Sequence, residues 1–116
     1  MQRLFILDAV IPAGFNTAQA LDLRGYRVRA LTTGAGWTPA DITFVITHDG
    51  VTGKYLRDSV GAQVKIPGAV ADSSYPVGAT WFEAAPTVYV VSGTATAPVN
   101  QVTQQTVQLI CVEDDS

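Results

Sequence analysis

The sequence predicts an all-β fold, a single-domain antiparallel β-sandwich of about eight short strands. Short runs rich in Val, Ile, Tyr and Thr alternate apolar with polar residues, the period of a strand with one buried face. Breaks that contain Gly or Pro separate these runs at roughly the 8–12-residue spacing of sandwiches and barrels. No segment sustains a helical period, and residues 17–23 are only a weak candidate for a helical turn. A length of 116 residues suits one modest core, so residues 1–116 are expected to form one domain.

Three strands are expected in the N-terminal third, at residues 4–11, 21–23 and 26–32. The first is apolar except at Asp8, and it stops at residues 12–14, where Pro and Gly lie together. In the third, Arg27 and Arg29 lie two residues apart and are expected to share a solvent-facing side. Uninterrupted alternation along this strand puts Ala30 on the opposite face.

The best-defined strand lies within residues 37–50, which read WTPADITFVITHDG. Ile42, Phe44 and Ile46 alternate with polar or smaller residues and are the leading candidates for the core. The dipeptide Asp49-Gly50 is a strong signal for a tight hairpin turn, so it is expected to end this strand.

The C-terminal half adds expected strands at residues 54–58, 62–66, 87–92 and 104–112, with a strand-like pair at 81–82. Between them, residues 67–78 hold two prolines, two glycines and two serines, which predicts a long surface loop. A loop cannot easily bury an aromatic ring, so Tyr75, with Pro76 beside it, is a candidate contact for a partner. The acidic residues 113–116 are expected to fray.

The two tryptophans allow two interpretations. Trp37 and Trp81 are expected to fill opposite ends of the core, which is the commoner use of large aromatic side chains. Alternatively, one of them anchors an interface, since tryptophan is enriched at binding hot spots.

The composition points to a protein that works by contact. Charged residues make up only 15% of the chain, against roughly 25% in soluble domains. Part of the surface is therefore expected to be covered by another copy or by a larger assembly, although a neutral Thr-, Gln- and Ala-rich surface can also stay in solution unaided. The net charge of −3 and the scattered basic residues argue against nucleic-acid binding.

No enzyme is expected, and no cofactor or metal. His48 and Asp49 are adjacent and would point to opposite faces of a strand, so they are poorly placed as a catalytic pair. No serine, glycine-loop or Cys/His motif of known spacing is present. A calcium site built from Asp41, Asp49 or Asp58 remains open but lacks any recognised spacing.

The lone cysteine and the hydropathy give two further expectations. Cys111 alternates with apolar residues and is expected to be a buried free thiol. No signal peptide and no apolar run of membrane-spanning length is visible, so we expect a soluble protein made in a reducing cytoplasm, with no membrane partner.

Several segments together resemble small virion proteins of tailed bacteriophages. They are IPAG at 11–14, LDLRG at 21–25, WTPADITF at 37–44, DG at 49–50, SG at 92–93, VNQ at 99–101 and VQL at 107–109. The block W-T-x-A-x-I-T-F followed by D-G is also similar to the core strand and turn of discoidin-like jelly rolls. The chain lacks the paired cysteines and the aromatic loop cluster of the sugar-binding discoidin type.

The resemblance implies a jelly-roll fold and a capsid decoration (cement) protein on the exterior of the virion. Its partners would be the major capsid protein or other virion proteins, and it would form a small homo-oligomer. The candidate contacts at the N-terminus are Gln2, Arg3, Leu4 and Phe5, on a strand that could add to the edge of a neighbouring sheet. The alternative is a module of the tail or fibre that binds a host-surface glycan or another tail protein.

Overall fold

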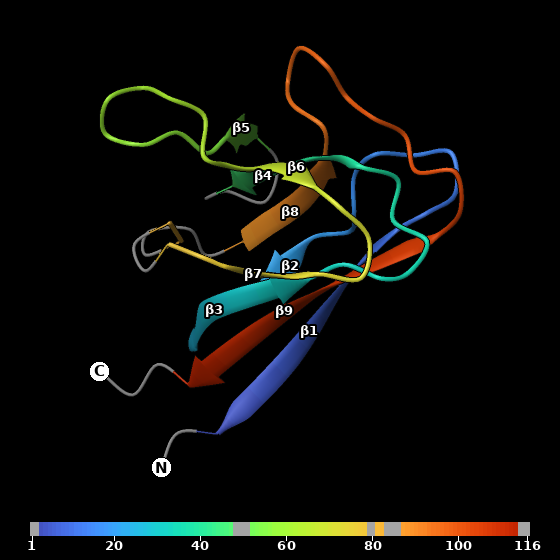
Figure 1. Ribbon diagram of the computed structural model, residues 1–116. Coiled ribbons are helices and arrows are strands. Elements are labelled where there is room, and N and C mark those ends of the chain that lie inside the picture. Colours follow the sequence, from blue (N-terminus) through green and yellow to red (C-terminus); the bar gives the residue numbers. More distant parts are fainter. Residues whose placement is uncertain (1–2, 48–51, 79–80, 83–86, 114–116) are drawn as a thin grey trace.

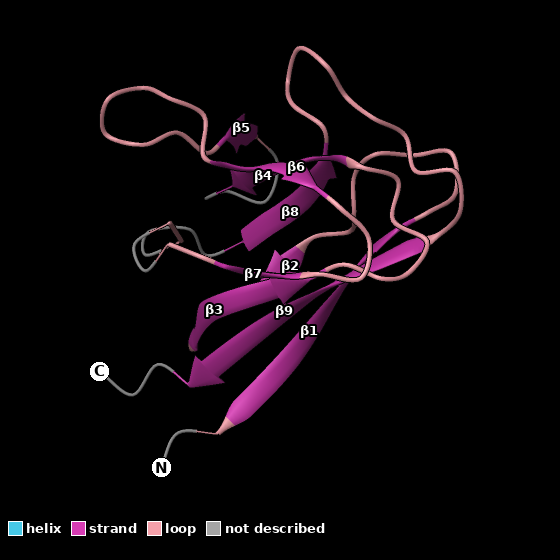
Figure 2. Ribbon diagram, in the orientation of Figure 1, coloured by secondary structure: helices cyan, strands magenta, loops and turns pink. Residues whose placement is uncertain are grey.

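The computed structural model describes residues 3–47, 52–78, 81–82 and 87–113. Within them, nine strands make up the regular structure: β1 (Leu4–Ile11), β2 (Leu21–Asp22), β3 (Tyr26–Thr32), β4 (Ala40–Thr47), β5 (Gly53–Tyr55), β6 (Lys65–Ala69), β7 (Ser74–Pro76), β8 (Thr87–Ser92) and β9 (Gln105–Glu113). The strands form two antiparallel sheets, and the described residues contain no helix (Figure 2). The predicted all-β sandwich is therefore confirmed.

The connectivity is that of a jelly roll. One sheet has the order β1-β9-β3-β7; the other has the order β2-β8-β4-β5, and β6 also pairs with β4 (Figure 1). The pairs β1/β9, β2/β8, β3/β7 and β4 with β5 and β6 are the rungs of one long antiparallel ribbon. The ribbon is folded so that β9 also pairs with β3, and β8 with β4. A double-sheet jelly roll is built in this way.

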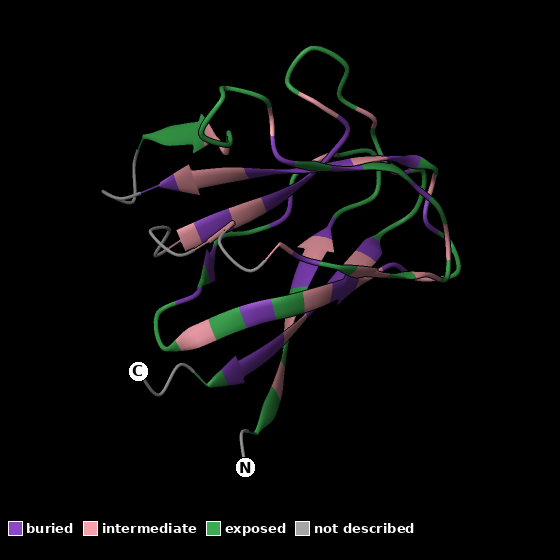
Figure 3. Ribbon diagram, turned by 60° about the vertical axis from the view of Figure 1, so that its left-hand side comes forward, coloured by how far each residue is buried: buried purple, intermediate pink, exposed green. Residues whose placement is uncertain are grey.

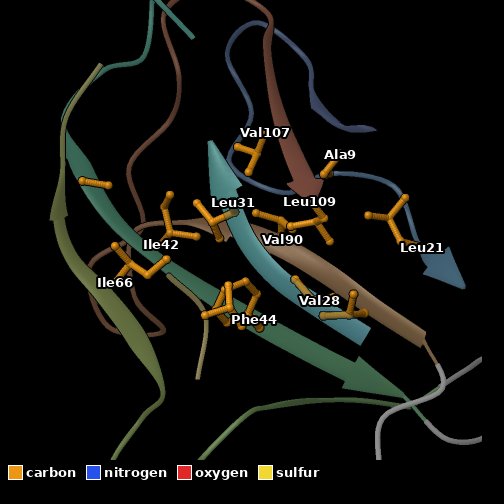
Figure 4. Packing of buried hydrophobic residues seen from close by; sticks show 14 of the residues in the cluster. Ala9, Leu21, Val28, Leu31, Ile42, Phe44, Ile66, Val90, Val107 and Leu109 are labelled. Atoms are coloured by element: carbon orange, nitrogen blue, oxygen red, sulfur yellow. The ribbon is translucent and has the colours of Figure 1, made fainter. Parts of the chain in front are cut away.

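The core lies between the two sheets, where their inward-facing residues meet. Phe44 and Ile42 on β4, Leu31 on β3 and Leu109 on β9 are completely buried, as Figure 4 shows. Side chains of this size each stabilise the fold by about 1.5–3 kcal/mol on burial. The sequence prediction for Ile42 and Phe44 is confirmed, and Ile46 is half-buried against the same cluster.

A bulge in β3 changes one predicted face. Val28 pairs with Cys111, but the next pair along is Ala30 with Ile110, so Arg29 is the extra residue. Beyond the bulge the alternation resumes one residue out of step. Ala30 therefore lies on the outer face of the sheet, and the prediction that it points inward is wrong.

The predicted loop at residues 67–78 is also wrong over half of its length. It contains the end of β6 and all of β7, because β6 pairs with β4 and β7 with β3. Both strands lie at sheet edges, where a proline does not break a ladder on its free side. Strand propensity and turn residues alone do not predict these two strands, because their pairing partners lie far away in the sequence.

The aromatic residues at 81–82 form a turn and not a strand. The rings of Trp81 and Phe82 pack on Phe44, with centroids 5.9 and 5.0 Å away. Trp37 is buried in the loop before β4, and its Nε1–H donates to the Ala69 carbonyl at 3.1 Å. The interpretation of both tryptophans as core-packing residues thus describes Trp37 fully and Trp81 in part, since Trp81 is half-exposed.

Candidate interaction surface

No group of three or more His, Cys, Asp or Glu lies together among the described residues. Asp22 and Arg24 form an exposed ion pair at 2.8 Å, and the hydrogen bonds from Arg24 lower the pKa of Asp22 to about 2. Burial raises the pKa of the Cys111 thiol to about 11, which keeps it protonated and unreactive at neutral pH. No helix in the described part of the chain could span a membrane.

The free edges of the two sheets differ in how they are protected. β2, β5 and β7 are only two or three residues long, and β6 carries Lys65 and Pro67. Short length, lysine and proline all discourage the pairing of an edge with another strand. β1 is eight residues long, contains neither lysine nor proline, and pairs only with β9 (Figure 1). It is the most open edge in the described structure.

The N-terminal half of β1 also exposes large apolar side chains. Leu4 is 71% and Ile6 57% exposed, both on the outer face of the sheet. In the register between the strands, Ile6 lies opposite Ile110 on β9, which lies opposite Ala30 on β3. These three residues form an apolar row across the outer face and end at the free edge. Figure 3 shows the N-terminal end of β1 exposed, while β1 itself becomes more buried toward its other end.

The C-terminal half of β1 is protected by one side chain. Gln19 Oε1 accepts from the Val10 N–H, and Gln19 Nε2 donates to the Asp8 carbonyl, both at 2.9 Å. The amide thus occupies the backbone groups that a neighbouring strand would use. Because backbone groups alternate in direction along a strand, those of Leu4 and Ile6 point to the same side as those of Asp8 and Val10. Neither Leu4 nor Ile6 has a partner on that side within the described residues.

Only some of the site residues expected from the sequence lie at this edge. Leu4 and Phe5 lie on the open edge; Arg3 lies next to it, with its guanidinium 5.7 Å from the Phe5 ring centroid. Gln2, Asp49 and Gly50 lie outside the described residues.

Tyr75 and Pro76 lie in β7, at the other edge of the same sheet, and not in a loop. Tyr75 is half-buried, and its hydroxyl accepts from the Val70 N–H at 2.9 Å. It is therefore a residue of the fold as much as a surface residue. Trp37 is buried and cannot serve as an exposed contact.

Ile6, Ile110 and Gln19 belong to this surface but are not singled out by the sequence pattern. For Ile6 a signal was present, because residues 4–7 are apolar at every position, which gives the strand two apolar faces. No sequence signal points to Gln19, because its hydrogen bonds to the β1 backbone depend on how the 12–20 loop returns along β1. Other exposed apolar residues lie elsewhere: Phe15 and Val102 on loops beyond the opposite end of β1, and Val60 near the tip of the 57–63 hairpin.

The fold and this surface define a jelly-roll module with one open, apolar sheet edge. Comparisons with protein-family models, with curated proteins and with solved structures found no match to the chain.

Proposed function

We propose that this protein is a structural component of a tailed-phage virion, a capsid decoration protein that binds the assembled head from outside and stabilises it. It acts through contact alone, without catalysis or a cofactor. The observation that carries the proposal is the open edge of β1, where exposed Leu4 and Ile6 lie beside backbone groups that have no partner within the described residues. An edge of this kind binds by adding a strand to a sheet.

Two further features support the proposal. Jelly rolls serve as building modules of viral capsids, although the same fold also occurs in lectins and other proteins. The low charge of the chain, 15% of residues, fits a surface that is largely covered in its working state.

The stabilisation would arise by linkage. A protein that binds only the assembled shell shifts the assembly equilibrium toward that shell, by about 2.7 kcal/mol per site at a free concentration 100 times the dissociation constant. A docking contact of standard size buries roughly 800 Å² on each partner.

The proposal is tested by co-sedimentation of the purified protein with heads that lack it, followed by heating of the particles. Saturable binding and a higher temperature of head disruption are the expected results. Heads that neither bind the protein nor gain heat resistance would remove the proposal.

Deletion of residues 2–5 tests whether the open edge of β1 is needed for head binding. We expect this deletion to abolish head binding, because it removes Leu4 and half of the open edge. The domain should stay folded at a cost of about 1–2 kcal/mol, mainly from the edge-to-face contact of Phe5 with Tyr26. Val60→Lys is the control, since Val60 is 86% exposed on a different surface. Circular dichroism and urea unfolding check the fold, and full binding by the deletion variant would exclude the edge.

The rival function is a tail or fibre module that binds a host-surface glycan. It needs Trp37 or Tyr75 as an exposed platform for a sugar, but Trp37 is buried, and Tyr75 is half-buried with its hydroxyl bonded to the Val70 N–H. Saturable binding on a glycan array, together with no binding to heads, would favour it over the decoration role.

A further inference from the structure

We propose that the partner of the open β1 edge is a second copy of this chain, joined in a two-fold dimer whose axis passes beside Phe5. This inference rests on the proposed function and names the occupant of its edge: the second copy takes the edge, and the pair joined through β1 is then what binds heads. In the dimer the two β1 strands run antiparallel. They join the β1-β9-β3-β7 sheet of one copy to the same sheet of the other, which makes one continuous sheet.

The two-fold axis limits the choice of register. In an antiparallel pair, residues directly opposite each other point to the same face. A two-fold axis perpendicular to the sheet must therefore pass beside a single residue, which lies opposite its own copy. Along the described part of β1 this leaves a small set of registers, each named by its central residue.

Among the registers centred on Phe5, Ile6 or Leu7, the backbone groups that are free select one. When Phe5 is central, the N–H and C=O of Leu4 meet those of the partner's Ile6, and the reverse pair forms by symmetry. Every backbone group used is unpaired in the described structure. When Ile6 or Leu7 is central, the pairing needs the Asp8 carbonyl, which Gln19 already binds.

The side chains agree with the same register. On the outer face, exposed Leu4 lies opposite the partner's Ile6, and exposed Ile6 opposite the partner's Leu4. The apolar row Ala30–Ile110–Ile6 then continues across the edge onto the partner's Leu4 and its neighbour on β9, Val112. With Ile6 central, the Asp8 carboxylate would face the partner's exposed Leu4, an unfavourable contact that the Phe5-centred register avoids.

The position of the edge leaves room for a second copy. β1 lies at the margin of its sheet, and its N-terminal end projects away from the second sheet (Figure 1). Gln19 has a second effect here, because it covers the Asp8–Val10 segment and confines the pairing to Leu4–Ile6. A short pairing of this length predicts a dimer that dissociates on dilution.

A disulfide reports the register directly. Residues opposite each other in a non-hydrogen-bonded antiparallel pair have Cα atoms about 4.5 Å apart, within the range that a disulfide spans. Phe5→Cys should therefore form a disulfide-linked dimer under mild oxidation. Leu7→Cys is the matched control on the same face, and it should stay monomeric because it lies opposite the partner's Arg3. The native Cys111 is buried and is retained in both variants.

Sedimentation of the unmodified protein over a range of concentrations gives a second, independent measurement. We expect a monomer–dimer equilibrium that Ile6→Lys weakens about tenfold or more, since lysine on an edge opposes strand pairing. Val60→Lys makes a similar change on a remote surface and should leave the equilibrium unaltered. Circular dichroism confirms that each variant is folded.

A protein that stays monomeric at all concentrations, with no disulfide-linked dimer of the Phe5→Cys variant, would overturn the dimer. Linkage of Leu7→Cys in place of Phe5→Cys would overturn the register. Monomers that still bind and stabilise heads would remove this inference and leave the proposed function standing. A dimer that does not bind heads would remove the proposed function and leave the dimer standing.

Discussion

At the scale of single residues, Gln101 joins the loops at one end of the sandwich. It is completely buried, and its Oε1 accepts from the Thr38 N–H at 2.7 Å. Its Nε2 donates to the Thr38 carbonyl and to Ser92 Oγ at 3.0 and 2.9 Å. The backbone of Gln101 also pairs with Gly14 and Phe15. One amide therefore satisfies polar groups from segments that are far apart in the sequence.

We predict that Gln101→Ala lowers the free energy of unfolding by about 2–4 kcal/mol, because it leaves the part-buried Thr38 backbone groups and the buried Ser92 hydroxyl without these partners. Gln104→Ala makes the same chemical change at an exposed position and should cost less than about 0.5 kcal/mol. Urea unfolding of both variants measures the difference. Equal losses would show that the buried amide contributes nothing specific.

Cys111 makes the stability depend on alkaline pH. Burial raises its pKa to about 11 in the folded state, whereas an unfolded cysteine titrates at roughly 8.5. The contribution of the buried thiol is therefore fully present below about pH 8.5 and is lost as the pH rises toward 11, by at most about 1.4 kcal/mol per pH unit.

We expect Cys111→Ala to lack this loss, so its stability deficit relative to the unaltered protein should shrink between pH 8 and pH 10.5. Urea unfolding at the two pH values tests this, since all other residues are common to both proteins. A deficit that stays constant with pH would contradict the role given to the thiol.

At the scale of elements, Gly93 connects the end of β8 to β4 in a way that no other residue could. Its φ is +92°, its N–H donates to the Asp41 carbonyl at 2.6 Å, and its carbonyl accepts from Thr43 Oγ1 at 2.7 Å. A Cβ at this position would lie 2.5 Å from the Ala97 carbonyl oxygen and from the Val99 nitrogen. Both are backbone atoms that cannot move aside alone.

Gly61 provides a matched comparison, since its φ is +87° but a Cβ there would meet nothing within 4 Å. We predict that Gly61→Ala costs about 1–2 kcal/mol from backbone strain alone. Gly93→Ala should cost at least about 2 kcal/mol more, because it adds a collision with the 94–99 loop. Thermal and urea unfolding measure both variants, and similar costs would mean that this loop yields without penalty.

At the scale of the whole molecule, the jelly-roll ribbon pairs segments that are remote in the sequence. β1 pairs with β9 from Leu4 opposite Val112 to Ile11 opposite Gln105. The closure of such long loops has to precede the contacts that stabilise them, which slows folding.

We therefore predict refolding on a timescale of milliseconds to seconds, without the microsecond phases of helical proteins. Stopped-flow dilution from urea, followed by the fluorescence of buried Trp37, measures the rate. Complete refolding within microseconds would show that local contacts dominate the folding of this chain.

The sequence by itself determined the local pattern of the protein. It predicted the all-β class, and the strands at residues 4–11 and 26–32 have the bounds expected. It also placed Ile42 and Phe44 in the core, because alternation along a strand is a property of neighbouring residues. These features depend on side-chain period and turn residues, which the sequence carries directly.

Only the tertiary structure decided which strands meet and which edge stays open. Half of residues 67–78 belong to two edge strands because β4 and β3 pair with them, and Ala30 lies on the outer face because of one bulge in β3 against β9. The candidate surface arose in the same way. Nothing local marks β1 as an edge or brings Gln19 to its backbone. The physical reason is that hydrogen bonds between strands join residues far apart in the chain, and local propensity does not encode that pairing.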